Sequence, residues 1–349
     1  MRVARFYAPQ DVRVEDAPEP SAGPGELVIR VRNCSTCGTD AKIWRSGHPD
    51  LRPPRVLGHE VAGEVAEVGE GAAGWSVGDR VQVIAAIPDG SCHECRRGGM
   101  SVCPNQERIG YHHDGGFAEL MRVPAKVLAV DGVNRIPDGL SFAEASVAEP
   151  LSCVINGQEH AGVGEGQTVV VVGAGPIGCM HVRLARARGA ARVFLAELSQ
   201  QRLEMAAGLV APDEAIRADA ADTVEAVRRL TGGRGADIII VAAASGKAQE
   251  DGLQMAARRG TVSFFGGLPK DKPTITCDSN IVHYREVGIV GANGSSPGHN
   301  KRALELIASG AVPVADLITH RLPLERTVEG IHTVARGEAI KVTIEDSAT

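Results

Sequence analysis

The chain has 349 residues, enough for two domains that each bury a core of their own. Its aromatic content of 3% and its net charge of −6, without a run of basic residues, argue against a nucleic-acid-binding protein and against a polybasic membrane arm. No apolar run approaches the ~18 residues of a membrane span and no export signal is recognisable, so we expect a cytoplasmic protein whose eight cysteines stay reduced.

The first ~150 residues predict a compact, β-rich, barrel-like domain. Short apolar stretches broken by Gly and Pro are typical of its strands, and they lie at 26–35, 61–71, 79–87 and 117–125. We place this first domain at residues 1–153.

From about Gly166 the pattern changes to strands that alternate with helices. Apolar strands are expected at 168–175, 191–197, 236–245, 261–267 and 287–292, and helices at 177–189, 199–209, 222–232 and 249–260. This alternation predicts an α/β domain, a doubly wound parallel sheet covered on both faces, at residues 154–290. The remainder, 291–349, contains one amphipathic helix at 300–312 and the strand-like segment 339–345, and it is too short for a third domain.

A glycine-rich turn follows the first strand of the second domain. Gly173, Gly175 and Gly178 stand between this strand and a helical pattern that opens with Pro176 and Ile177. Such glycines allow a tight turn, close approach of a pyrophosphate and close helix packing, so the turn indicates a dinucleotide site. Glu197, at the end of the next strand, is expected to bind the adenosine ribose and to repel a 2′-phosphate, which favours NAD over NADP. Arg202 lies one helical turn further on and is a weaker cofactor-binding candidate.

The first domain contains a ligand set that suits zinc. Cys37 in NCSTCGTD and the pair His59 and Glu60 in GHE supply a thiolate, an imidazole and a carboxylate. Three protein ligands leave one coordination position open, which is typical of a catalytic site.

Together these motifs make the chain similar to the zinc-dependent medium-chain dehydrogenases, closest to the sorbitol (L-iditol) and threonine dehydrogenase branch. The resemblance rests on CGTD, GHE, the cysteine-rich lobe, GGFAE, EPLS, GAGPIG and KVTI, and it covers essentially the whole chain. It implies a GroES-like catalytic domain, an inserted Rossmann domain, and a C-terminal return to the catalytic domain. It also implies a homodimer or homotetramer that assembles through the Rossmann sheet edge.

The resemblance assigns roles to single residues. Cys37 and His59 are implied zinc ligands, while Glu60 and Glu149 of EPLS compete for the remaining protein position. Asp40 resembles the acid that orients the zinc histidine, and Thr39 resembles the hydroxyl that relays the proton of the alcohol. Lysine at position 42 replaces the histidine of many relatives and is a poor proton shuttle at neutral pH.

A second metal site is predicted in the lobe DGSCHECRRGGMSVC. Family members with a structural zinc carry four cysteines here, whereas this chain has Asp89 followed by Cys92, Cys95 and Cys103. An aspartate oxygen can ligate zinc, so a site of three thiolates and one carboxylate is plausible.

The expected activity is hydride transfer from a secondary alcohol of a polyol, cyclitol or sugar-like substrate to NAD, which gives a ketone. Polar pocket candidates favour a hydroxylated small molecule, and they are Trp44, His48, His112, His113, Asn293 and Ser295. Two alternatives stay open: a threonine-type amino-acid dehydrogenase and a nucleotide-binding relative without turnover.

Overall fold

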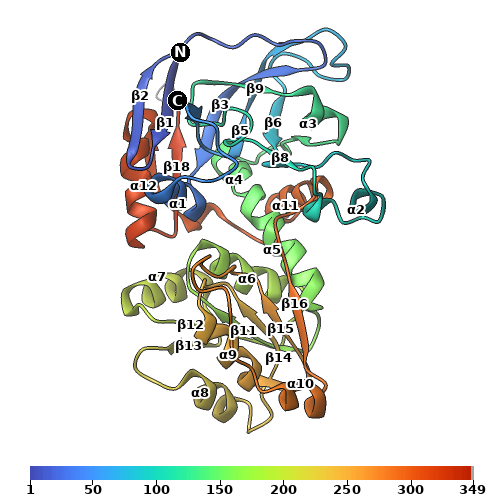
Figure 1. The fold of residues 1–349 in the computed structure, drawn as a ribbon, viewed down its shortest axis with the longest axis vertical. Coiled ribbons are helices and arrows are strands. Elements are labelled where there is room, and N and C mark those ends of the chain that lie inside the picture. Colours follow the sequence, from blue (N-terminus) through green and yellow to red (C-terminus); the bar gives the residue numbers. More distant parts are fainter. Residues whose placement is uncertain (347–349) are drawn as a thin grey trace. The chain divides into compact units, whose positions relative to one another are not determined.

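The computed structural model describes residues 1–346 and divides the chain into two compact units (Figure 1). The β-rich unit comprises Met1–Ser152 together with the chain from Gly294 onward, and the parallel-sheet unit comprises Cys153–Asn293. The sequence placed the two boundaries at 153 and 290. Among the described residues, the longest apolar helices fall short of what crossing a bilayer requires.

One large sheet organises the β-rich unit, with strand order β10-β6-β5-β3-β18-β17 and with β9 also paired to β3. Its strands are β3 (Leu27–Ser35), β5 (Glu60–Val68), β6 (Arg80–Val83), β9 (Leu120–Val123), β10 (Val133–Arg135), β17 (Ile318–Pro323) and β18 (Lys341–Glu345). Smaller sheets contain β1 (Arg2–Ala8), β2 (Asp11–Asp16) and β4 (Arg55–Val56), and separately β7 (Ala86–Ile87) with β8 (Glu107–Arg108).

The core of this unit forms where the inward side chains of these strands meet. Along β3, Leu27, Ile29 and Val31 alternate toward one face, as the two-residue period of a strand dictates. They belong to one cluster with Phe6 of β1 and Phe117, both of which are fully buried.

Helices and short 3₁₀ turns complete the unit. The helices are α1 (Gly38–Ser46), α2 (His93–Arg96), α3 (Ala125–Ala129), α4 (Phe142–Ser146), the start of α5 (Ala148–Ala161), α11 (Pro297–Ala308) and α12 (Thr327–Arg336). The 3₁₀ turns are η1 (Met100–Val102), η2 (Ala315–Leu317) and η3 (Leu324–Arg326).

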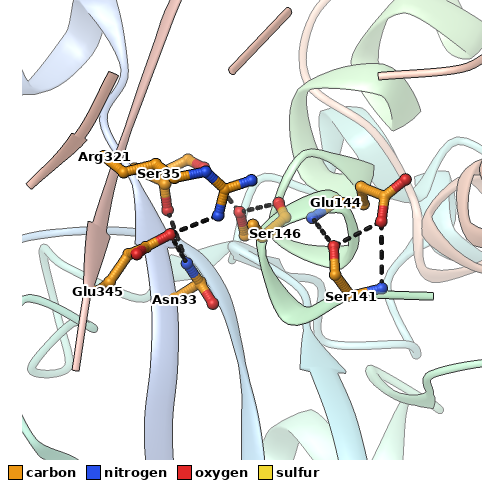
Figure 2. A network of polar contacts seen from close by, with 9 residues as sticks. Asn33, Ser35, Ser141, Glu144, Ser146, Arg321 and Glu345 are labelled. Carbon is orange, nitrogen blue, oxygen red and sulfur yellow. Dashed lines mark hydrogen bonds and ion pairs between the residues drawn. The ribbon is translucent and has the colours of Figure 1, made fainter. Parts of the chain in front are cut away.

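The C-terminal strand β18 returns to the N-terminal half of the chain and pairs antiparallel with the end of β3. Figure 2 shows the polar contacts that accompany this return. Asn33 of β3 donates to Glu345 of β18 at 3.1 Å, and Arg321 of β17 pairs with the same carboxylate at 2.6 Å. On the other side, the buried hydroxyls of Ser35 and Ser146 lie 2.6 Å apart and join β3 to α4. The end of β3 is therefore fixed from two sides.

The parallel-sheet unit confirms the predicted fold class. Its six strands are all parallel in the order β13-β12-β11-β14-β15-β16. The strands are β11 (Thr168–Val172), β12 (Arg192–Glu197), β13 (Glu214–Arg217), β14 (Ala236–Val241), β15 (Ala256–Phe264) and β16 (Gly288–Gly291). The helices are α6 (Pro176–Ala187), α7 (Gln200–Val210), α8 (Thr223–Leu230), α9 (Gly246–Met255) and α10 (Ser279–Arg285).

One sequence prediction is wrong within this unit. The helix expected at 249–260 ends at Met255, and the segment AARRG that follows is the first part of β15. Ala and Arg favour a helix intrinsically, but Ala256 pairs with Ala236 of β14 and is buried. Tertiary pairing has overridden local propensity here.

Candidate active site and metal centres

Cys37 owes its position to the end of β3. It is the N-cap residue of α1, and its backbone N–H donates to Oδ2 of Asp40 at 2.8 Å, within the first turn. The preceding residue, Thr36, donates its backbone N–H to Val342 of β18 at 2.9 Å. The thiol thus stands at a strand-to-helix junction that two backbone contacts hold in place.

His59 and Glu60 reach the same place because β5 pairs antiparallel with β3. In this register Glu60 lies opposite Ser35, two residues before Cys37. Gly58, with a φ of 89°, makes the turn that leads into β5. Antiparallel pairing therefore brings together two motifs that are about twenty residues apart in the chain.

The loop at 110–117 packs directly against this turn. Backbone N–H groups of Gly115, Gly116 and Phe117 donate to the segment 56–58 at 2.8 to 3.0 Å. A Cβ on Gly115 would lie 2.1 Å from the carbonyl oxygen of Gly58, so only glycine permits this approach. The glycines of DGGFAE therefore allow this loop to pack closely against the backbone next to His59.

The ligand atoms of Cys37, His59 and Glu60 all lie within 4.8 Å of one another. Nδ1 of His59 is 3.7 Å from Oδ1 of Asp40, and Asp40 is 1% exposed. Oε1 of Glu60 is buried and accepts no hydrogen bond from residues 1–346. One soft donor, one imidazole and one carboxylate with an unsatisfied oxygen fit Zn²⁺.

Of the three potential ligands, Cys37 is shifted toward the state that binds a metal, whereas burial raises the pKa of Glu60. Burial raises the pKa of the Cys37 thiol, but the hydrogen bond with His59 and the charge of His59 lower it by more, so the net direction is downward. For His59, burial lowers the pKa while Asp40 and Cys37 raise it, and the net pKa is well above the ordinary value. A thiol beside a cationic partner has thiolate character, which is the form that binds zinc.

Lys341 is a site residue that the sequence reasoning missed. It is 2% exposed, forms an ion pair with Glu60, and donates to the backbone oxygen of Thr36 at 2.8 Å. Burial alone would lower the pKa of Lys341, but Glu60 and Cys37 raise it, and the net direction is upward. The only signal in the sequence was a lysine within the apolar stretch AIKVTI. The Lys341 ammonium group contacts one carboxylate oxygen of Glu60, beside the set of potential zinc ligands.

Glu149 and Thr39 flank the group without belonging to it. Glu149 lies in the first turn of α5 and is 9% exposed; burial raises its pKa, while the nearby His59 opposes this. Its carboxylate is not among the ligand atoms that lie within 4.8 Å of one another. Thr39 is half-buried in the first turn of α1.

The cysteine-rich lobe brings together four potential ligands. Ligand atoms of Asp89, Cys92, Cys95 and Cys103 lie within 4.8 Å of one another, and all eight cysteines of the chain are thiols. Burial and the two neighbouring thiols raise the pKa of Cys95 to about 12. Three sulfur atoms and one carboxylate oxygen within this distance form a donor set that fits structural zinc.

Asp89 is oriented for this group by its neighbours. Oδ2 accepts from the Asn105 amide at 2.5 Å, and Oδ1 accepts the backbone N–H groups of Ser91 and Cys92 at 2.8 and 2.9 Å. These hydrogen bonds hold the pKa of Asp89 well below its usual range. Asp89 is therefore an ionised oxygen donor beside the three cysteines.

The glycine-rich turn of the parallel-sheet unit has the predicted form. Gly173 has a φ of 111°, Gly175 is the N-cap residue of α6, and Pro176 and Ile177 open that helix. A Cβ on Gly178 would lie 1.8 Å from the carbonyl oxygen of Gly173, so the helix packs onto the turn only with glycine there.

A cavity of about 370 Å³ adjoins this turn. Gly173, Glu197, Asp222, Ser245 and Lys247 are among its lining residues, and Arg202 is not. Oε2 of Glu197 accepts the backbone N–H of Ala174 at 2.9 Å, which aims the carboxylate at the glycine-rich turn. The arrangement suits a ribose-binding acid beside a pyrophosphate-binding turn.

The substrate candidates have different neighbours in the structure. His48 contacts the ring of Tyr111, with centroids 5.0 Å apart, while Trp44 packs against His332 of α12 and the core of the β-rich unit. His113 pairs with Glu107 at 2.6 Å and lines a different cavity, of about 240 Å³, which His112 also lines.

The two remaining candidates stand on either side of the point in the chain where the parallel-sheet unit ends and the β-rich unit resumes. Asn293 is exposed at the end of the parallel-sheet unit. Ser295 is buried, and its hydroxyl lies 2.7 Å from that of Ser152 and accepts from Asn300. Ser295 therefore has a role within the β-rich unit itself.

Comparison with known families agrees with both units. The family described as "Alcohol dehydrogenase GroES-like domain" matches residues 23–134, and "Zinc-binding dehydrogenase" matches residues 176–309. An L-threonine 3-dehydrogenase from Pyrococcus horikoshii is 35% identical over 347 residues, covering 98% of this chain and 96% of its own. A sorbitol dehydrogenase from Halalkalibacterium halodurans is 29% identical over 333 residues, covering 95% and 94%.

Two solved dehydrogenase structures are similar to this chain over nearly its whole length. A zinc-binding dehydrogenase from Sinorhizobium meliloti, bound to NADP, superposes with a TM-score of 0.91 at 30% identity and covers 99% of this chain and 98% of its own. The alcohol dehydrogenase TADH from Thermus sp. ATN1 superposes with a TM-score of 0.90 at 29% identity and covers 99% and 100%.

Proposed function

Because the chain belongs to the zinc-dependent medium-chain dehydrogenases of the sorbitol and threonine branch, we propose that it oxidises a secondary alcohol of a polyol, cyclitol or sugar-like substrate with NAD. Family membership makes the protein an oxidoreductase of the zinc-type alcohol dehydrogenase class. The observation that carries the proposal is the close group formed by Cys37, His59 and Glu60.

We assign the catalytic zinc to Cys37, His59 and one carboxylate. When bound, zinc supplies a Lewis acid that lowers the pKa of a coordinated hydroxyl by several units. Asp40 would orient His59, and the Thr39 hydroxyl would relay the proton of the alcohol toward solvent, accepting that proton as it donates its own. Glu60 is our choice for the third ligand because its carboxylate lies in the group, with Glu149 as the alternative.

A second zinc is proposed for the lobe of Asp89, Cys92, Cys95 and Cys103. This site has no open position for substrate, so its contribution is to the stability of the lobe. One oxygen donor in place of sulfur predicts weaker binding than a site of four thiolates has.

NAD is proposed as the cofactor because a carboxylate at position 197 repels a 2′-phosphate. The relative from Sinorhizobium meliloti binds NADP, so this choice calls for a direct measurement. We expect kcat/KM to be at least about tenfold higher with NAD than with NADP, since the juxtaposition of like charges costs several kcal/mol. A preference for NADP would show that Glu197 does not select the cofactor.

The decisive experiment combines metal analysis with a substrate screen. We expect about two zinc ions per chain, and NAD reduction with sorbitol, xylitol, myo-inositol, aminocyclitols or hexitol phosphates. Cys37→Ser is expected to lose one zinc and the activity, while Cys277→Ser, at an exposed cysteine, retains both. A protein without zinc, or one inactive on every alcohol, would refute the dehydrogenase proposal.

Threonine is the second candidate substrate because a threonine dehydrogenase is among the relatives at 35% identity. The same screen separates the two candidates, since turnover of threonine without turnover of polyols would replace our proposal. A nucleotide-binding relative without turnover would bind NAD but fail in every assay.

A further inference from the structure

Tyr111 lies beside the potential zinc ligands Cys37, His59 and Glu60, and the proposed reaction assigns it no role. Its side chain is 7% exposed, and its ring centroid lies 6.4 Å from that of His59 and 5.0 Å from that of His48. Gly110, with a φ of 79°, turns the chain just before it. The backbone contacts between 115–117 and 56–58 fix this loop relative to His59.

The ring is almost fully buried, but the phenol hydroxyl is not one of the enclosed polar atoms that lack a partner, and no residue of 1–346 hydrogen-bonds it, so it is open to solvent. A tyrosine with a buried ring and a solvated hydroxyl can exchange that water for a polar group of a ligand. Burial, Asp40 and Cys37 raise the pKa of Tyr111, so the group is a neutral donor at working pH. A hydroxyl of this kind is poised to bind a polar group that enters the site.

The surrounding charges indicate which polar group fits. Charges of both signs lie around the phenol: Asp40 and Glu149 are acids, and His59 is a base whose pKa is raised. Two further cations are already engaged, because Lys341 pairs with Glu60, and Arg108, 5.8 Å from the Tyr111 ring, pairs with Asp50 at 3.1 Å. A neutral substrate hydroxyl matches these surroundings because it can both accept from and donate to the phenol.

We propose that the Tyr111 hydroxyl hydrogen-bonds the hydroxyl next to the oxidised carbon, so that the enzyme selects alcohols with hydroxyls on adjacent carbons. This inference rests on the proposed function and narrows its substrate class to vicinal diols and the polyols and cyclitols that contain them. Tyr111 is accordingly a specificity-determining residue.

Matched substrate pairs that differ by one hydroxyl test the proposal. Butane-2,3-diol is compared with butan-2-ol, and cyclohexane-1,2-diol with cyclohexanol, over all stereoisomers and with zinc-replete enzyme. For Tyr111→Phe we expect kcat/KM for the preferred diol to fall by about 10- to 100-fold, because a buried hydrogen bond to substrate is lost. The value for the mono-alcohol should change by less than about twofold.

Binding supplies a readout that does not need turnover. Calorimetric titration of the diol into zinc-loaded protein without NAD should show a weaker dissociation constant for Tyr111→Phe by a similar factor. Tyr284→Phe is the matched control because Tyr284 is 70% exposed and lies in the parallel-sheet unit. Circular dichroism and zinc content should match the wild type for both variants.

The possible failures are distinguishable. If the wild type oxidises diols and Tyr111→Phe keeps the same diol-to-mono-alcohol ratio, the role of Tyr111 is refuted and the proposed function stands. Equal losses on diol and mono-alcohol would mean that Tyr111 only supports the fold, which also refutes the inference. If the wild type oxidises no alcohol at all, the proposed function itself fails.

Discussion

His181 of α6 is a buried ionisable residue whose charge the fold does not accommodate. It is fully buried, its ring packs edge-on against Phe265 with centroids 4.7 Å apart, and Nε2 has no hydrogen-bond partner among residues 1–346. Burial, with a smaller effect from Arg188, lowers the pKa of His181 to about 3. The neutral imidazole is therefore part of the core, as an apolar side chain would be.

This pKa predicts a loss of stability in acid. The folded-state pKa lies below the unfolded value, so the unfolded chain takes up the proton first and stability falls as pH drops from 6.5 toward about 3. The expected slope from this residue is about 1.4 kcal/mol per pH unit. His181→Leu should remove that slope in denaturant unfolding between pH 7.5 and 4.5, whereas His160→Gln, at an exposed histidine of α5, should keep it. Equal slopes in wild type and His181→Leu would contradict the assignment.

Lys341 and Glu60 show how a buried charge pair can serve a metal site. Removing either partner alone would leave an uncompensated charge in the interior, which is a large cost. The register explains their meeting, because Thr343 of β18 lies opposite Ser35 of β3, and Glu60 of β5 lies opposite the same residue on the other side. Three neighbouring strands inside the sheet, β5, β3 and β18, thereby bring the acid, the thiol and the lysine together near the end of β3.

The turn at 56–58 and the loop at 110–117 form a single supporting element for His59. Their contact depends on the absence of a Cβ at Gly115, where one would lie 2.1 Å from the Gly58 oxygen and 2.5 Å from the Leu57 oxygen. Both obstructing atoms belong to backbone, so neither side can yield by a change of rotamer.

Gly115→Ala is expected to displace this element. We expect destabilisation of the β-rich unit by about 1–3 kcal/mol or more, together with reduced zinc occupancy, because His59 moves with the turn. Differential scanning calorimetry and metal analysis measure the two effects. Gly208→Ala serves as the control, since a Cβ there meets nothing within 4 Å and Gly208 lies in the last turn of α7, where alanine favours the helix. Full zinc content in Gly115→Ala would disprove the supporting role.

Strand β16 forms one edge of the parallel sheet and pairs only with β15 among the described residues. Ile289 on this strand is 42% exposed, and Tyr284 of the preceding helix is 70% exposed. An exposed apolar edge strand is a template for pairing with another chain. We therefore expect a homo-oligomer in which β16 pairs with its counterpart.

Ile289→Lys tests this assembly. A charge on the edge strand opposes pairing, so we expect the dissociation constant of the oligomer to rise at least about tenfold. Light scattering coupled to size-exclusion chromatography measures the mass over a dilution series. Val77→Lys is the control, since Val77 is 69% exposed on the β-rich unit. A monomeric wild type, or a variant as oligomeric as the wild type, would refute the edge contact.

The sequence by itself determined the fold class and the family, because both rest on local patterns. The segment from Gly173 to Glu197 has the pattern of a glycine-rich turn, a helix and an apolar strand. The residues in CGTD and GHE identify the types of zinc ligand. These features need no knowledge of distant contacts. Reliance on local patterns also explains the error at the end of α9. Ala256 has a high helix propensity, but it pairs with β14 and belongs to a strand.

Only the tertiary structure decided which of the candidates share a site. Lys341 is 281 residues from Glu60 in the chain, and their pairing depends on the register of three strands that no local pattern encodes. Tyr111 likewise reaches His59 only because two glycine-containing segments pack backbone to backbone. Such contacts depend on long-range sheet pairing and close packing, and for the same reason the contact of Trp44 with His332 and the pairing of His113 with Glu107 could not be found in the sequence.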